Sequence, residues 1–239
     1  MSYIFDAFLY YPLFNALIFI YNYASFGDLG IAIIVLTILI RFLLFPLFYK
    51  SFEHQTIMQK LQPEVRQIQH EHKEDKEKQA LKMMELYKQH KVNPFSGFLL
   101  ILVQLPVLIA LYSVFSSGLA DEALSGLYSF IYNPERLNHL FLGLIDLNKK
   151  NIVIVVVAAL AQYYQTKLTL PKPNSSAPAS ENSDPTAAIA KNMVIIGPLM
   201  TVFILAYLPS AIGVYWLTSS VFSLLQQWYI NKKVYGKNN

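Results

Sequence analysis

Long apolar segments alternate with short charged ones along this 239-residue chain. A membrane-spanning helix needs about 20 mostly apolar residues. Five segments meet or approach that length: Leu29–Phe48, Ser96–Phe115, Ile152–Leu168, Asn192–Leu208 and Ser210–Ile230. The third and fourth are short for an average bilayer, which indicates a thinner membrane or polar surroundings at their ends. The pattern predicts an all-α membrane protein with five transmembrane helices.

The first 26 residues are also apolar, but they are rich in Tyr and Phe. Ala7–Phe26 is long enough to span a bilayer, yet it contains Asn15 and Asn22. Aromatic residues of this kind favour the headgroup region, so we expect residues 1–26 to form an interfacial amphipathic helix. A sixth transmembrane helix is the alternative. Because residues 1–26 contain no Lys or Arg, the segment lacks the positive region of a signal peptide, and we expect the mature protein to keep it.

The basic residues define an orientation. If the first span runs from outside to inside, most of the 19 Lys and Arg residues lie in the cytoplasm and few lie outside. This asymmetry follows the positive-inside rule. It predicts an external N-terminus and a cytoplasmic C-terminus.

The segments between the spans differ in character. The segment 51–94 carries apolar positions at helical spacing on both sides of a charge run, which predicts a helical hairpin. The segment 119–150 is too apolar to be fully exposed to water, so we expect it to pack on the membrane surface. The segment 171–191 has the Pro- and Ser-rich composition of a disordered linker. The expected units are residues 1–26 (interfacial helix), 27–50 (first transmembrane helix), 51–94 (cytoplasmic helical hairpin), 95–118 (second transmembrane helix), 119–150 (external loop), 151–170 (third transmembrane helix), 171–191 (disordered cytoplasmic linker), 192–231 (a tight hairpin of the fourth and fifth transmembrane helices) and 232–239 (short cytoplasmic tail).

Arg41 lies about 10 Å from the inner end of the first span, at 1.5 Å per residue. A central arginine costs at least about 2.5 kcal/mol, so its head either snorkels to the inner headgroups or faces a water-filled cavity. Thr37 lies one turn away on the same face, and Gln104 and Ser223 fall at a similar depth in other spans. Each alone is typical of helix packing, but together they favour a hydrophilic groove. No Asp or Glu occurs inside any predicted span, which leaves room for an acidic group from another molecule.

Several function classes lack their usual residues. The sequence contains no cysteine, and its five histidines lie outside the spans without metal-ligand spacing. It has no Walker A loop, no dinucleotide fingerprint and no paired nucleophile at membrane depth. The net charge of +4 is small and scattered, which disfavours nucleic-acid binding. We therefore expect a protein that is not an enzyme, with no catalytic residues, no metal and no cofactor.

The polar and proline positions resemble those of the YidC-type family of membrane protein insertases, which has mitochondrial and thylakoid members. The resemblance extends from about residue 2 to residue 233. The matching motifs are Thr37 with Arg41-Phe-Leu-Leu-Phe-Pro46, Leu61-Gln-Pro63, Asn93-Pro94, Gln104-Leu-Pro106, Phe141-Leu-Gly143, Asp146-Leu147, Pro198, Tyr215-Trp216 and Gln226-Gln227.

The resemblance implies five helices around a groove that is open to the cytoplasm and to lipid, in the bacterial plasma (inner) membrane. It implies an insertase and chaperone that moves short hydrophilic tails of client proteins through this groove and releases their helices into the bilayer. Implied partners are newly made membrane proteins, the lipid bilayer and the general secretion channel. The ribosome is only a weak partner, because the tail after Ile230 is nine residues long and the long basic tail of some members is missing. The large external domain of many Gram-negative members is missing as well.

The expected groove residues are Arg41 as the charge, with Thr37, Gln104, Tyr215, Trp216 and Ser223 as substrate contacts.

A small-molecule or ion transporter is the main alternative function. Such proteins usually show an acidic residue within the membrane or related repeats with broken helices. Gly197-Pro198 offers one break, but the sequence shows neither a partner repeat nor an acid in a span. A purely structural assembly subunit is a third alternative, which the polar positions disfavour.

Overall fold

The computed structural model describes residues 3–117, 126–134, 136–169 and 185–236. These residues are mostly helical, and several of the helices are apolar, as expected of an all-α membrane protein. The elements are α1 (Tyr3–Phe5), the π-helix η1 (Asp6–Tyr10), α2 (Tyr11–Tyr23), α3 (Leu29–Leu43), α4 (Phe45–Lys60), α5 (Gln62–Glu71), α6 (Lys76–Gln89), α7 (Ser96–Ser117), β1 (Leu140–Phe141), β2 (Ile145–Asp146), α8 (Ile152–Thr169), α9 (Pro185–Leu205) and α10 (Ser210–Gly236).

Not every predicted span reaches the length of a bilayer. Among the described residues, Tyr3–Tyr23 and Ser96–Ser116 are long and apolar enough to cross a membrane. The bent pair α3 and α4 adds a third crossing if it counts as one span. Ile152–Leu168 and Val194–Leu205 are shorter apolar helices. Five spans therefore stay a prediction, and so does the interfacial position of residues 1–26.

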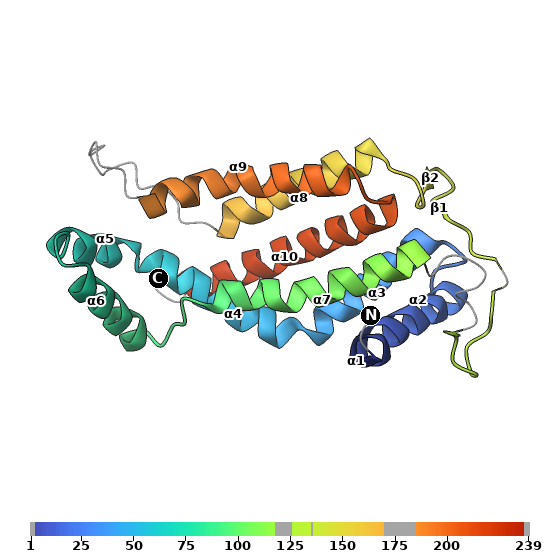
Figure 1. Ribbon diagram of the computed structural model, residues 1–239, viewed down its shortest axis with the longest axis horizontal. Coiled ribbons are helices and arrows are strands. Elements are labelled where there is room, and N and C mark those ends of the chain that lie inside the picture. The colour runs from blue at the N-terminus through green and yellow to red at the C-terminus, as the bar shows by residue number, and fades with distance from the viewer. Residues whose placement is uncertain (1–2, 118–125, 135, 170–184, 237–239) are drawn as a thin grey trace.

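Helix α10 lies at the centre of the helical arrangement, where it packs against α8, α3 and α4. The α5–α6 hairpin lies at one end of the elongated molecule and the β1–β2 ribbon at the other (Figure 1). Helices α9 and α10 were expected to form a tight hairpin, but they meet little beyond their connection, because α8 packs against both. Gly213 permits the close approach of α10 to α8, since a Cβ there would lie 2.5 Å from Ile154 Cγ2.

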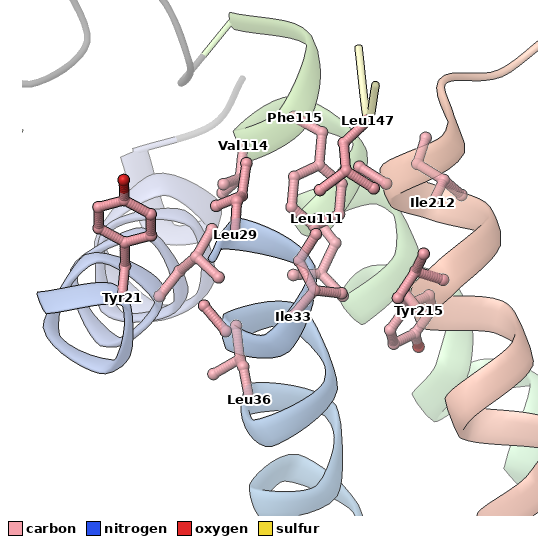
Figure 2. Packing of buried hydrophobic residues seen from close by; sticks show 14 of the residues in the cluster. Tyr21, Leu29, Ile33, Leu36, Leu111, Val114, Phe115, Leu147, Ile212 and Tyr215 are labelled. Atoms are coloured by element: carbon pink, nitrogen blue, oxygen red, sulfur yellow. The ribbon is translucent and has the colours of Figure 1, made fainter. Parts of the chain in front are cut away.

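The main core is formed by apolar side chains from α2, α3, α7, α8 and α10. Figure 2 shows Ile33 of α3 beside Leu111 of α7, whereas Leu29 of α3 lies on the side of Tyr21 of α2. Leu147, which directly follows β2, is fully buried in the same cluster. The core therefore joins helices that are far apart in sequence and anchors the loop before α8.

The first predicted span, Leu29–Phe48, is not one straight helix. Helix α3 ends at Leu43, and α4 begins at Phe45 with its axis turned by 68°. Pro46 stands in the first turn of α4, where its missing N–H is tolerated, whereas a proline inside a continuous helix would remove a hydrogen bond. Because α4 continues to Lys60, the expected boundary between residues 50 and 51 falls inside a helix.

Two other expected boundaries differ as well. Helix α9 begins at Pro185, so residues 185–191 of the expected linker are helical, and a proline suits the first turn of a helix. Residues 171–184, which are the rest of that linker, lie outside the described residues, as do residues 119–125 of the expected external loop. Helix α10 continues to Gly236 and includes most of the expected tail.

The described part of the external loop is attached to the N-terminal helices. The Asn15 side chain donates to Gly126 O at 3.3 Å and accepts from Tyr128 N at 2.7 Å. Asp28 caps α3 by accepting from Ile31 N at 3.0 Å, and its other oxygen accepts from Leu142 N at 2.7 Å. The loop therefore packs on the protein itself, and its contact with a membrane surface stays a prediction.

The β1–β2 ribbon depends on a glycine in α3. A Cβ at Gly30 would lie 2.1 Å from the Phe141 ring, so only glycine lets β1 pack this closely on the helix. In the turn that follows, Gly143 has a φ of 70°, a conformation that favours glycine. Asp146 forms an ion pair with Lys149 at 2.9 Å, and the hydrogen bond from Lys149 lowers the pKa of this partly exposed carboxyl below its usual value. In the Phe141-Leu-Gly143 motif, Phe141 therefore packs on α3 and Gly143 forms the turn between β1 and β2.

Candidate functional site

Arg41 is buried at the end of α3, with 7% of its surface exposed. Its Nε donates a hydrogen bond of 2.9 Å to the hydroxyl of Ser219 in α10, and Nη2 donates to the same oxygen. The guanidinium carbon lies 4.4 Å from the centre of the Phe48 ring, a cation–π contact. Nη1 is buried and has no hydrogen-bond partner among the described residues. The guanidinium therefore has neutral neighbours and one unused donor group.

Thr37 and Ser223 lie on the helix faces that carry this contact. Thr37 is buried one turn before Arg41, and its hydroxyl donates to Ile33 O of its own helix at 2.6 Å. Ser223 is buried one turn after Ser219, and its hydroxyl has no partner among the described residues. Thr37 therefore shares a face of α3 with Arg41, and Ser223 shares a face of α10 with Ser219, although neither forms a hydrogen bond to Arg41.

Gln104 and Tyr215 extend the polar contacts to α7. The Gln104 amide donates to the Tyr215 hydroxyl, and this hydrogen bond joins α7 to α10. Tyr215 is buried and stands one turn before Ser219, on the same face of α10. Two neighbouring turns of α10 thus bind a side chain of α3 and a side chain of α7.

Trp216 belongs to a different group. Its indole N–H donates to Gln162 Oε1 of α8 at 3.3 Å, and the Ser220 hydroxyl donates to the same oxygen at 3.3 Å. Trp216 follows Tyr215 directly, so its side chain leaves α10 in another direction. The structure therefore places this candidate on the α8 side of α10, apart from the Arg41 contact.

A second polar network joins α4 to the last turns of α10. The Gln227 amide donates to Thr56 Oγ1 at 2.9 Å and to Asn231 Oδ1 at 2.8 Å, and the Thr56 hydroxyl donates to Asn231 at 2.9 Å. Gln226 donates to Phe45 O at 3.4 Å, directly after the bend between α3 and α4. These contacts hold α4 against α10 on the side of the molecule that carries the α5–α6 hairpin.

Two cavities lie near these helices, and neither is lined by Arg41. One, of about 360 Å³, lies between α4 and the start of α7, where Lys50, His54 and Leu102 are among its lining residues. The other, of about 290 Å³, lies between α4 and α10 and is lined by Phe45, Phe222, Leu225, Gln226 and Tyr229. A groove around Arg41 therefore stays a prediction.

The two residues that contact the guanidinium, Ser219 and Phe48, were not among those predicted from the sequence. Ser219 stands between Tyr215 and Ser223 at intervals of four, so a helical-face argument from those two candidates would have found it. Phe48 is seven residues after Arg41, which is two helical turns. The bend at Leu44 separates the two residues into different helices, and no sequence signal places the ring over the guanidinium.

Comparison with known proteins identifies the family. The family model described as "60Kd inner membrane protein" matches residues 19–237. A membrane protein insertase YidC of Fusobacterium nucleatum is 36% identical over 207 residues, which cover 87% of this chain and 88% of that protein. Proteins with the same name from Citrifermentans bemidjiense and Oleidesulfovibrio alaskensis are 34% and 35% identical over 93% and 98% of this chain. The chain spans only 36% and 40% of the length of those two proteins. The resemblance seen in the motifs is thus confirmed along the whole region that carries Arg41 and α10, and the chain belongs to the 60Kd inner membrane protein family.

Proposed function

We propose that this protein is a membrane protein insertase and chaperone. It moves short hydrophilic tails of client proteins through a cytoplasm-open groove and releases their helices into the bilayer. The F. nucleatum relative, which this chain covers over 88% of its length, is named a membrane protein insertase, and this similarity supports the same function here.

The observation that carries the mechanism is the incomplete set of partners around Arg41. An arginine has five N–H donors and a permanent charge. Here the described partners are a serine hydroxyl and an aromatic ring, both neutral, and Nη1 is unused. A buried charge is normally paired. An acidic client tail entering beside α3 and α10 would supply the missing carboxylate.

The proposed groove residues are Arg41 with Thr37, Gln104, Tyr215, Trp216 and Ser223. Support for Arg41, Gln104, Tyr215 and Trp216 comes from the polar contacts that join α3, α7, α8 and α10. Support for Thr37 comes from its buried position one turn before Arg41, and support for Ser223 comes from its buried hydroxyl one turn after Ser219. Trp216 and its partner Gln162 form the wall next to α8 in this arrangement. Arg41 attracts the tail, and the hydroxyl and amide groups replace part of the water that the tail loses.

The proposed membrane layout has five spans, with the N-terminus outside and the C-terminus in the cytoplasm of a bacterial inner membrane. The spans are carried by α3 with the start of α4, and by α7, α8, α9 and α10. The positive-inside rule supports this orientation, as does the position of the α5–α6 hairpin and the β1–β2 ribbon at opposite ends of the molecule (Figure 1). Residues 1–26 lie at the external interface.

The energetics of this function require no bound nucleotide. Polar groups cross an intact hydrocarbon core at high cost because nothing there bonds with them. A groove that reaches partway across shortens that path. The membrane potential contributes about 2.3 kcal/mol per charge at 100 mV to the outward movement of an acidic tail, and burial of the client helix in lipid completes the step. The partners are newly made membrane proteins and the lipid bilayer, with the general secretion channel beside them and the ribosome bound weakly.

An assay in reconstituted vesicles tests the function. Vesicles that contain the purified chain receive a single-span test protein with an acidic tail, and the fraction inserted is measured by protease protection. Ion flux is recorded in the same vesicles. We expect insertion well above that of empty vesicles, without ion flux. Ion flux with insertion equal to that of empty vesicles would show a transporter instead.

A further inference from the structure

The cavity of about 360 Å³ between α4 and α7 lies at the expected level of the inner headgroups. Lys50 stands at the cytoplasmic end of the first predicted span, and Ser96 begins the second. The Ser51 hydroxyl donates to Ser96 O, so the two span ends are held together at this point. Under the proposed layout, the cavity therefore opens where lipid headgroups meet the protein.

The lining of this cavity includes polar residues of α4 and apolar residues of α7. Lys50 and His54 line it from α4, and the buried Nδ1 of His54 has no hydrogen-bond partner among the described residues. Leu99 and Leu102 line it from α7 and are 41% and 51% exposed. Leu102 follows Ser96 by six residues, about 9 Å along the helix axis. A cationic end is thus followed by an apolar wall that reaches into the membrane.

We propose that this cavity binds one anionic phospholipid of the cytoplasmic leaflet. The phosphate lies between the Lys50 ammonium and the imidazole of His54, and the first carbons of an acyl chain lie along Leu99 and Leu102. Basic pockets between transmembrane helices on the cytoplasmic side suit anionic headgroups, and pockets for small ligands have volumes of about 300–1,000 Å³. Because Arg41 does not line the cavity, this site is separate from the proposed groove.

Lipid binding can be measured without any insertion step. The full chain, purified in detergent, is titrated with dioleoyl phosphatidylglycerol or dioleoyl phosphatidylcholine and analysed by native mass spectrometry. We expect phosphatidylglycerol to bind more tightly by about fivefold or more. Lys50→Gln should remove most of that preference. Lys50 is exposed, so its packing role is small. Lys232→Gln is the matched control, because this exposed lysine near the end of α10 does not line the cavity.

Two further arms test the apolar end and the source of the phosphate. Leu102→Trp should weaken binding of both lipids by filling the cavity. Excess glycerol 3-phosphate should displace little phosphatidylglycerol, because it lacks the acyl chain. Equal binding of the two lipids by the parent, or an unchanged preference in Lys50→Gln, would overturn the proposal. Displacement by glycerol 3-phosphate would assign the site to a free phosphate compound instead. None of these results bears on whether the protein inserts clients.

Discussion

The Nε of Arg41 donates a 2.9 Å hydrogen bond to the hydroxyl of Ser219, 178 positions later in the chain. This contact joins α3 to α10 inside the helical arrangement, and it uses a neutral acceptor for a charged donor. The guanidinium is thus positioned without being neutralised, which suits a group that attracts a passing carboxylate. Five predictions test this arrangement and the layout around it.

Ser219→Ala should destabilise the protein. The substitution leaves the buried Nε and Nη2 donors of Arg41 without their acceptor, and such a loss typically costs about 1–3 kcal/mol. The free energy of unfolding in detergent measures the effect. Thr218→Ala is the control, because its hydroxyl donates only to Val214 O of its own helix, at 2.8 Å. Equal stability of the two variants would mean that the Arg41 contact adds nothing to the fold.

The charge of Arg41 should matter more than its shape. Arg41→Lys should keep most of the insertion of a client with an acidic tail. Arg41→Ala should reduce that insertion about fivefold, because one basic residue contributes about 1 kcal/mol to the attraction of an anionic group. A client with a neutralised tail should respond much less. Insertion into vesicles that hold each variant measures both effects. If Arg41 only snorkels to the headgroups, Arg41→Ala inserts the acidic client as well as the parent does.

Cysteine labelling should reveal the orientation, since the chain has no cysteine of its own. In intact cells, an impermeant thiol reagent should label Arg136→Cys and leave Glu74→Cys untouched. Both positions are exposed, and Glu74 precedes Asp75, which caps α6 and is better left unchanged. Labelling of both positions after the membrane is disrupted is the control. Labelling of Glu74→Cys from outside would reverse the proposed topology.

A cysteine at position 2 decides between the two interpretations of the N-terminal helices. Labelling of Ser2→Cys from outside agrees with an interfacial helix. Protection in intact cells, followed by labelling after disruption, would instead make Tyr3–Tyr23 a sixth span, for which it is long and apolar enough.

Removal of the α5–α6 hairpin should leave the main core folded. The hairpin has its own small cluster, which includes Leu61, Val65, Leu86 and Val92 and shares no residue with the main core. A short Gly/Ser bridge in place of residues 62–90 should therefore change the stability of the rest by about 1 kcal/mol or less, because distant contacts act independently. Unfolding in detergent measures this stability. Client insertion by the same variant should fall, and full insertion would argue against a role in recruiting clients.

The helix positions were the part of the fold most accessible from sequence. The expected Ile152–Leu168 is α8 almost residue for residue, because an Asn and a polar linker bound its apolar run. The packing of the helices on one another was harder to predict from the sequence. Nothing in the pattern shows that α8 separates α9 from α10, since all three helices are apolar on several faces and the sequence order favours neighbours. Tertiary contacts decided that arrangement.

The candidate site was accessible at the level of helix faces only. The pattern placed Thr37 and Arg41 on one face, and the structure agrees, but the hydroxyl of Thr37 bonds to its own helix. Likewise, Ser223 was chosen by depth, and the residue that binds Arg41 is Ser219, one turn earlier on the same face. Depth in a span is known from sequence to about one turn, which is too coarse to assign a hydrogen-bond partner.

The central place of α10 also has a consequence for the order in which this protein assembles. Synthesis runs from the N-terminus, so α3, with its arginine, leaves the ribosome long before Ser210–Gly236 does. Until that last helix is complete, the guanidinium lacks its serine acceptor, and the faces of α3 and α8 that α10 covers have no neighbour. The half-made protein must therefore hold an unshielded charge at the membrane, the same difficulty that we propose it solves for its clients.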